Sequence, residues 1–456
     1  MPPGTAASRR LRGGLADVVA AGARPPAPLE TASLSVEMDI DNYARIVRGK
    51  EFYPMRHRRL TTRMITAASA AAAALVLACA PGALAQQRPA DLTALPPVPT
   101  DYTPKKTPWG DYDFRGTWPI ENINAARILF QRPAPYGNRV WVNDAEFAKR
   151  LAAAQRSDGN FSNDRGVNAA GTQGLAKWVQ DSSFGHRTSM LVSPADGQLP
   201  PLTPQAEALY KAGRSGWVPG QDYDDPSDFD SWDRCVSRGY PASMYPFRYN
   251  NGIRVFQSPG YVVIMLEMLG TRVIPLDGRP RWPGNVEAWM GNSRGHWEGK
   301  TLVIETTNIK SGDSVTRDLN KRAASPVNMA TQAVPPFNTI PTSTKAKTIE
   351  RLTMTGPNTI VHELTYSDPE VFTQPWTTRI EWTRDDSYEF YEYACHEGNV
   401  QLRNYITASR AHRAARAAGQ VPENEVDSRE RFAMPFDRDP AVAPDGPPPA
   451  AAQRRE

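Results

Sequence analysis

From Ile253 onward the chain alternates hydrophobic and polar positions in short runs that are rich in β-branched and aromatic residues. Each run ends at a turn signal, such as Ser258-Pro259-Gly260, Glu298-Gly299 or Gly356-Pro357-Asn358. Short alternating runs bounded by Gly, Pro, Asn and Asp are typical of strands. We expect strands at residues 253–257, 261–268, 272–276, 295–297, 301–306, 347–355, 359–366, 376–383 and 388–394.

Strands that follow one another so closely predict a mainly β fold built as an antiparallel meander. A closed meander is a barrel of the lipocalin or calycin type, and a split one is a sandwich. We favour the barrel, because sequential neighbours pair most easily. The insertion at residues 310–346 would cover one end. Alternation places His362 on the same side as Ile360 and Leu364, but it leaves open whether charged positions face solvent or line a polar interior.

The regions on either side of this β domain, which we place at residues 233–410, lack strand periodicity. Residues 86–232 predict an irregular region with short helices that packs on the β domain. One helix is expected at residues 143–155 with Asn143 as its cap, and another from Pro204 to about Ala212 with Thr203 as its cap. Residues 113–118 predict a first strand or an anchoring segment. Residues 411–456 predict a tail that is first helical and then disordered.

A secretory signal peptide is predicted at residues 55–85. It begins with a short basic stretch, continues through an apolar run from Ile65 to Ala78, and ends in Ala83-Leu84-Ala85 before Gln86. This order is that of a signal peptide. The apolar run is shorter than the roughly 20 residues of a membrane span, so we expect no integral span after cleavage.

Cleavage near Ala85 predicts a periplasmic or secreted protein. Because a signal peptide works at the N-terminus, we interpret residues 1–54 as an extension from a mis-assigned upstream start. Cys79 lies in a sequence that loosely resembles a lipoprotein cleavage site. Lipid attachment there is the less favoured alternative.

Removal of residues 1–85 changes the charge balance. These residues hold 11 of the 53 basic and 6 of the 49 acidic residues, so residues 86–456 carry 42 basic and 43 acidic side chains. A nearly neutral chain lacks the basic surface that is typical of nucleic-acid binding, and we expect no nucleic-acid partner. Its 371 residues fit one large domain or two ordinary ones. The oligomeric state stays open.

Only two cysteines, Cys235 and Cys395, follow the predicted cleavage site. In an oxidising compartment two cysteines most economically form one disulfide, so we predict a Cys235–Cys395 bridge. Two unpaired buried thiols are the alternative. A bridged Cys395 would exclude a thiol nucleophile beside His396.

Polar and aromatic residues concentrate in three segments. They are residues 267–280, residues 289–307, which begin Trp-Met-Gly-Asn-Ser-Arg-Gly-His-Trp-Glu-Gly, and residues 391–399, which read Tyr-Glu-Tyr-Ala-Cys-His-Glu-Gly-Asn. With these motifs the chain resembles a large family of uncharacterised exported bacterial proteins, over roughly residues 114–410. The resemblance implies an exported β-rich domain and no particular reaction.

The chain departs from the family pattern at three polar positions. Gly270 and Arg281 stand where the family usually has histidine, and Asn292 stands where it usually has aspartate. If those side chains carry chemistry in other members, that chemistry would be lost or altered in this chain.

His296 is the best candidate for a general base, because histidine titrates near neutral pH. Arg294 and Glu298 lie two positions to either side, so all three would share one face of a strand. Such a catalytic row would polarise a carbonyl, accept a proton and orient the imidazole. The alternative is a structural histidine held by a hydrogen bond in a turn.

Six further residues are predicted to bind a ligand, because they add charge or an aromatic face to the motif segments and neighbouring strands. They are Glu267, Arg272, Arg351, His396, Glu397 and Trp289. For His396 and Glu397 a structural corner is the alternative. The histidines after the signal peptide show no metal-binding spacing, and the chain has no phosphate loop, nucleophile elbow or dinucleotide fingerprint. We therefore predict no metal and no cofactor.

Three functions fit these features. The favoured one is an acid–base enzyme of isomerase, lyase or hydrolase type that acts on a small organic molecule in a pocket. The second is a non-catalytic, lipocalin-like carrier of an apolar or aromatic ligand. The third is a structural or interaction protein of the cell envelope. The enzyme is favoured because histidine and arginine beside carboxylates are more polar than a carrier of apolar ligands requires.

Overall fold

The computed structural model describes residues 88–162, 174–216, 218, 220–247, 249–312, 325–328, 337–421 and 439–442, without the side chains of residues 161 and 162. The chain divides into two units, Met1–Ala78 and Cys79–Glu456, and all of the described residues belong to the second. The predicted extension, the predicted signal peptide with Cys79, and the greater part of the predicted insertion and tail lie outside the described residues.

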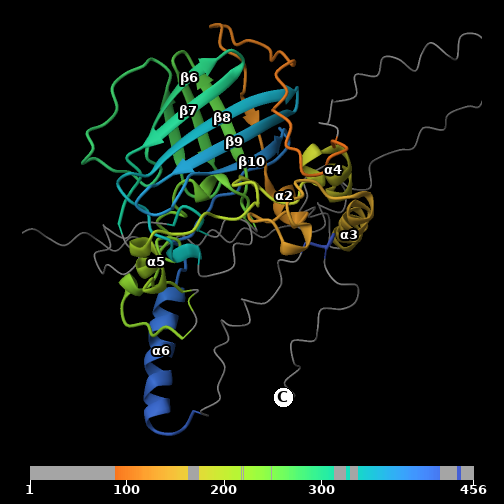
Figure 1. Ribbon diagram of the computed structural model, residues 1–456. Helices are drawn as coiled ribbons and strands as arrows, with labels where there is room; N and C mark the ends of the chain where they lie inside the picture. The colour runs from red at the N-terminus through yellow and green to blue at the C-terminus, as the bar shows by residue number, and fades with distance from the viewer. Residues whose placement is uncertain are drawn as a thin grey trace, which may run out of the picture. The chain divides into compact units, whose positions relative to one another are not determined.

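The described strands form two antiparallel sheets (Figure 1). The smaller sheet has the order β1-β3-β4-β5, with the bounds Gly116–Thr117, Ile253–Ser258, Tyr261–Leu266 and Thr271–Pro275. The larger sheet has the order β2-β10-β9-β8-β7-β6, with the bounds Leu191–Ser193, Trp376–Thr383, Thr359–Ser367, Lys347–Gly356, Thr301–Thr307 and Asn292–Glu298. The predicted strands from 253–257 to 376–383 are thereby confirmed.

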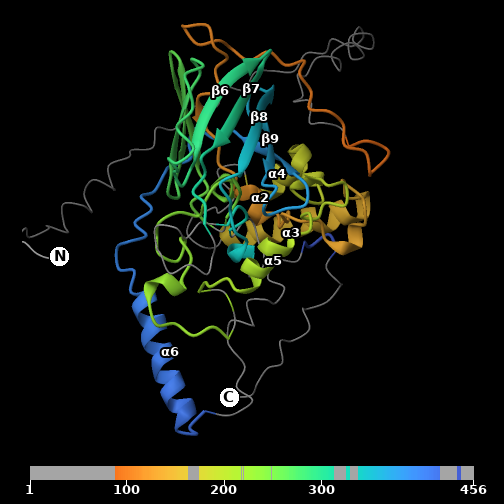
Figure 2. The same ribbon diagram turned by 60° about the vertical axis from the view of Figure 1, so that its left-hand side comes forward.

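Sequential neighbours pair as hairpins, and the turn residues explain where each strand ends. Gly260 closes the β3–β4 hairpin and Gly299 closes the β6–β7 hairpin, both with positive φ angles that glycine adopts without strain. In the described part of the chain no hydrogen-bonded ladder joins the two sheets, and no closed barrel is found there. Figure 2 shows the two sheets as separate layers.

The hydrophobic core lies between the two sheets. Val262 and Ile274 of the smaller sheet belong to the same buried cluster as Ile304 and Leu352 of the larger one. The sheets approach closely at Gly295 in β6, where a Cβ atom would lie 2.7 Å from Leu276 and 3.0 Å from Ile274. The side chains that alternation groups with Ile360, including His362, face this interior.

The helices lie outside the two sheets. They are α2 (Glu121–Ala125), α3 (Asp144–Ser162), α4 (Leu175–Asp181), α5 (Pro204–Lys211) and α6 (Gln401–Ala417). The two predicted helices correspond to α3 and α5. Asn143 accepts a hydrogen bond from the Glu146 amide, and Thr203 accepts one from the Ala206 amide, as their capping roles require.

Two segments near the C-terminus differ from the prediction. Residues 388–394 are not a strand, because the Tyr391 amide donates to the Glu267 carboxylate instead of to a neighbouring strand. Helix α6 begins inside the range predicted for the β domain and extends away from the sheets in both views. In the tail, Asp439 is buried and forms an ion pair with the buried Arg150, where disorder was expected.

None of the described helices combines the length and the apolar character that a membrane-spanning segment requires.

Candidate functional site

The core between the sheets contains one charged network, centred on Glu350 in β8. Its carboxylate accepts hydrogen bonds from Arg272 in β5 at 2.5 and 3.0 Å, from His362 in β9 at 2.9 Å and from the Tyr240 hydroxyl at 2.7 Å. Glu350 and His362 are fully buried. Burial raises the pKa of Glu350, but the charge of Arg272 and the hydrogen bond from His362 outweigh burial and bring it to about 2. Arg272, predicted to bind a ligand, is therefore occupied by an internal partner.

The predicted catalytic row lies on the opposite, solvent-facing side of the larger sheet. His296 Nε2 is 3.2 Å from Glu298, and Glu298 forms an ion pair with Arg351 of the neighbouring strand at 2.8 Å. These three side chains are 51%, 48% and 42% exposed. Arg294 is held apart from them, because its guanidinium donates to the carbonyl groups of residues 279, 280 and 293. The structure thus brings His296 together with Glu298 and Arg351 on an open surface.

A third group of charged residues lies at the end of the smaller sheet, around Glu267. This residue follows β4 and is 6% exposed. Its carboxylate accepts hydrogen bonds from the Gly252 amide at 2.9 Å, the Asn250 side chain at 3.1 Å, the Tyr388 hydroxyl at 2.8 Å and the Tyr391 amide at 3.0 Å. Four donors fix this carboxylate in one orientation.

Glu121, the first residue of α2, completes this group. The chain that leads to it runs beside β3, because Trp118 and Ile120 donate backbone hydrogen bonds to Ile253 and Asn251. This pairing places Glu121 near Glu267. Both carboxyl groups interact with the single hydroxyl of Tyr388. We call Glu121, Tyr388 and Glu267 the rim cluster.

The rim cluster shifts the pKa values of two of its members. Burial raises the pKa of Glu121, the Tyr388 hydroxyl opposes this, and the nearby carboxylates of Glu267 and Asp385 add to it, so the pKa is about 7. Burial and the two glutamates also raise the pKa of Tyr388. Glu121 is therefore a carboxyl group that exchanges its proton near neutral pH, which is the property of a general acid or base.

Gly252 allows this close arrangement. A Cβ atom at this position would lie 2.5 Å from Phe390, 2.8 Å from Tyr388 and 2.9 Å from Glu267. Because these distances are shorter than real Cβ contacts, any larger residue would displace the tyrosine or the carboxylate. The need for glycine here comes from packing against the site.

Aromatic side chains surround the rim cluster. Phe390 packs edge-to-face on Tyr388 and lies under the Arg254 guanidinium at 4.3 Å. Beyond it, Tyr391 and Tyr249 are 69% and 50% exposed. Exposed tyrosines offer flat faces and hydroxyl groups to an organic ligand. The group thus combines acid–base residues with aromatic contact surface.

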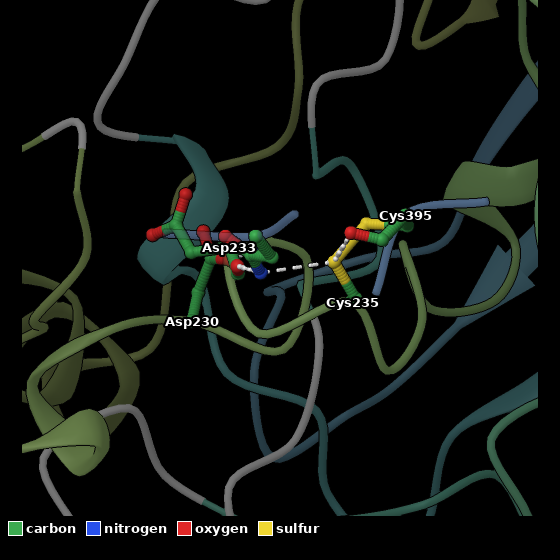
Figure 3. The surroundings of a disulfide bond; sticks show 5 residues. Asp230, Asp233, Cys235 and Cys395 are labelled. Atoms are coloured by element: carbon green, nitrogen blue, oxygen red, sulfur yellow. Dashed lines mark hydrogen bonds between the residues drawn. A yellow bond between two sulfur atoms is a disulfide. The ribbon is translucent and has the colours of Figure 1, made fainter. Parts of the chain in front are cut away.

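The predicted disulfide is present and anchors the segment that carries Tyr388. Cys235 and Cys395 are bonded with a Cα–Cα distance of 5.6 Å, and the side chain of Asn399 donates to the Cys235 sulfur (Figure 3). The bridge joins positions 160 residues apart, and closing so long a loop would stabilise the fold by on the order of 5 kcal/mol. It holds Cys395 beside the loop of Asp230 and Asp233 (Figure 3).

Three predicted ligand-binding residues lie outside these groups. His396 and Glu397 are exposed in the turn after the disulfide, and Trp289 is half-buried in the turn before β6. A separate cleft of about 250 Å³ lies between α5, the ends of the insertion and the β9–β10 connection, and Glu370 is its one charged lining residue. Across the described ranges no three His, Cys, Asp or Glu side chains are placed to hold a metal ion.

Sequence reasoning identified Glu267 but missed its two partners. Glu121 is an isolated acidic residue in a segment without a motif, and nothing in its surroundings in the sequence marks it. Tyr388 fell within a predicted strand, where alternation would have given it a packing role. The signal that could have pointed to Tyr388 is the density of aromatic and acidic residues from Tyr388 to Tyr393.

Comparison with known proteins gives no relative from which a site could be transferred. No family model, curated protein or solved structure matches this chain. The candidate site therefore depends on the geometry of Glu121, Tyr388 and Glu267 alone.

Proposed function

We propose that this chain is an exported acid–base enzyme, and that the rim cluster transfers a proton to or from a small organic molecule. The observation that carries the proposal is the Tyr388 hydroxyl shared between two carboxyl groups. One of them, Glu267, is fixed by four donors, whereas the other, Glu121, has a pKa of about 7. A carboxyl group whose pKa is raised to near neutrality is suited to general acid–base catalysis.

In this proposal the three residues have different roles. When Glu121 is protonated, its hydroxyl donates to the Tyr388 oxygen, and Tyr388 donates to Glu267. When Glu121 is ionised, the single Tyr388 hydrogen is shared between two carboxylates, and their repulsion makes Glu121 a base that readily accepts a substrate proton. Glu267 keeps Tyr388 oriented throughout. Isomerisation, elimination and hydrolysis all need such a residue.

The surroundings of the rim cluster favour an aromatic or apolar substrate without negative charge. Glu267 and Asp385 would repel an anion, whereas Tyr249 and Tyr391 present exposed rings. The same rings support a second candidate function, a carrier that binds an aromatic ligand without turnover. Export agrees with the Cys235–Cys395 disulfide, because disulfides persist in oxidising compartments. For the fold, we propose a sandwich of the two sheets.

Deuterium exchange in D₂O tests the enzyme proposal. The purified protein is incubated with a panel of small aromatic and carbonyl compounds, and mass spectrometry detects deuterium uptake or product. We expect Glu121→Gln to slow the reaction by about 100-fold or more, because it removes the titrating group. Glu207→Gln on α5 is the matched control, since Glu207 only pairs with Lys211 on the surface.

A second variant, His296→Ala, separates the rim cluster from the exposed row. Loss of turnover in Glu121→Gln with retention in His296→Ala supports the rim cluster, and the reverse result moves the chemistry to the outer face. Ligand binding without turnover in the unmodified protein would favour the carrier.

A further inference from the structure

A buried arginine without a partner lies on the far side of the larger sheet from the core. Arg187 follows the short 3-10 helix Ser183–His186 and is 3% exposed. Within the described residues its guanidinium donates no hydrogen bond and forms no ion pair, and its Nε atom is buried without a partner. Its contacts are with the rings of Trp141 and Phe184, at 5.2 and 5.6 Å. Aromatic rings attract a cation but cannot accept its five hydrogen bonds.

A second arginine nearby is also incompletely bonded. Arg132 is 3% exposed, and its Nη1 donates to the Ala195 carbonyl at 2.7 Å. Its Nε and Nη2 atoms are buried and have no partner among the residues that the structure describes. Gly197 passes so close that a Cβ atom there would lie 2.9 Å from the guanidinium carbon. Arg132 therefore lies directly beneath the exposed loop around Asp196.

The fold brings these arginines together on adjacent extended segments. Leu191 pairs by a backbone hydrogen bond with Phe130, and Met190 accepts one from Arg379 in β10. Arg187, Arg132 and Arg379 are consequently close enough to repel one another. Burial lowers the pKa of Arg187 to about 9, the charges of the other two arginines add to this effect, and the carboxylates of Glu363 and Glu381 oppose it.

The nearby carboxylates are already engaged. Glu363 accepts a hydrogen bond from Arg379 at 2.9 Å, and Glu381 accepts from the hydroxyl groups of Ser182 and Ser183 at 2.7 and 2.6 Å. Burial also raises the pKa of Glu381, which weakens it as a counter-charge. Both carboxylates attract Arg187, but neither forms a hydrogen bond or an ion pair with it among the described residues. Buried cations in folded proteins are almost always paired, and the described residues give Arg187 no hydrogen-bonded counter-charge.

We propose that Arg187 and Arg132 form a binding site for a small oxyanion, a phosphate or a carboxylate group. The planar guanidinium presents two parallel N–H groups that match two oxygens of such an anion. The free Nε and Nη2 atoms of Arg132 supply a second fork. This site lies on the outer side of β10, and its role is separate from proton transfer by the rim cluster.

Thermal unfolding at constant ionic strength tests the site. Chloride is replaced by phosphate in one series and by acetate in another, and Tm is followed for the unmodified protein and for Arg187→Met. We expect phosphate, acetate or both to raise the Tm of the unmodified protein by about 3–5 °C at a hundredfold excess over Kd. A response to phosphate alone identifies an inorganic oxyanion, and a response to acetate identifies a carboxylate ligand.

The Arg187→Met variant gives the opposite pattern. Because it removes a buried cation that lacks a partner in chloride, its Tm in chloride should equal or exceed that of the unmodified protein, and the specific anion response should vanish. The exposed Arg403→Met on α6 is the control and should keep the full response. General salting effects act equally on all three proteins.

Equilibrium dialysis of the unmodified protein against radiolabelled phosphate and radiolabelled acetate removes any dependence on the folding of a variant. Saturable binding of one anion per chain supports the site. The absence of a Tm response together with the absence of saturable binding of either anion would overturn it, as would a full response in a folded Arg187→Met protein.

Discussion

Two groups of charged residues meet at strand β8 of the larger sheet and have opposite environments. In each, a glutamate bridges a histidine and an arginine. On the inner face, Glu350 contacts His362 at 2.9 Å and Arg272 at 2.5 Å, and both side chains of the Glu350–His362 pair are fully buried. The side chains of the inner group are buried between the two sheets, with Arg272 2% exposed.

On the outer face, Glu298 contacts His296 at 3.2 Å and Arg351 at 2.8 Å, and all three side chains are about half exposed. Strand β8 contributes to both groups, because Glu350 and Arg351 are consecutive and therefore point to opposite faces. The two groups share a glutamate, a histidine and an arginine, and the inner one adds the Tyr240 hydroxyl, so their main difference is burial.

Burial decides what each group can do. Removing one partner of a buried ion pair leaves an uncompensated charge and costs about 3–5 kcal/mol, whereas an exposed pair contributes about 0–1 kcal/mol. The inner group is essential to stability but sealed from any substrate. The outer group is accessible to solvent, but solvent screens the charges of its side chains. The rim cluster lies between these extremes, since Glu121 is buried enough to titrate near pH 7 and still partly exposed.

The largest expected effect is the difference in stability between variants of Arg272 and Arg351. We predict that Arg272→Met lowers the free energy of unfolding by about 3–5 kcal/mol, because Glu350 stays buried without its cation. Arg351→Met, which removes the same charge from the outer face of the larger sheet, should change it by less than about 1 kcal/mol. Urea unfolding of both variants measures the two values.

Equal losses in the two variants would contradict the comparison. They would mean that burial does not separate the inner group from the outer one.

A smaller change in the free energy of unfolding is expected at acid pH. The pKa of Glu350 is lowered in the folded protein to about 2 from 4.5 in the unfolded chain. Its contribution to stability is therefore present above pH 4.5 and is lost as the pH falls from there towards 2. Unfolding of the unmodified protein and of Glu350→Gln, followed from about pH 5 to about pH 2.5, should give a steeper loss in the unmodified protein. Parallel curves would show that Glu350 is not stabilised in its ionised form.

The strands could be predicted from the sequence because their signals are local. Alternation and the turn glycines at positions 260 and 299 act within a few residues, and they located β3 to β10. Alternation also predicted which residues share one face of a strand, as with Ile360 and His362. Which face points inward depends on the second sheet, and alternation within one strand contains no information on that.

The rim cluster could not be predicted, because its members are distant in sequence. Glu121 reaches Glu267 only through the pairing of residues 118–120 with residues 251–253, and Tyr388 reaches both through a segment anchored by the disulfide. The predicted catalytic row on β6 combined a histidine, an arginine and a glutamate at a spacing that places them on one face, and its strand was located correctly. Residue type and spacing did not reveal that this face is open to solvent.

The pH dependence of stability tests the central claim, the titration of Glu121 near neutral pH, most directly. The folded-state pKa is raised to about 7 from 4.5, so the contribution of Glu121 to stability is fully present below pH 4.5 and is lost as the pH rises to 7. Glu121→Gln imitates the protonated carboxyl at every pH. The account predicts that the Tm of the variant, relative to the unmodified protein, rises between pH 4.5 and 7 and is constant above 7.5. A difference that is constant across this range would contradict it.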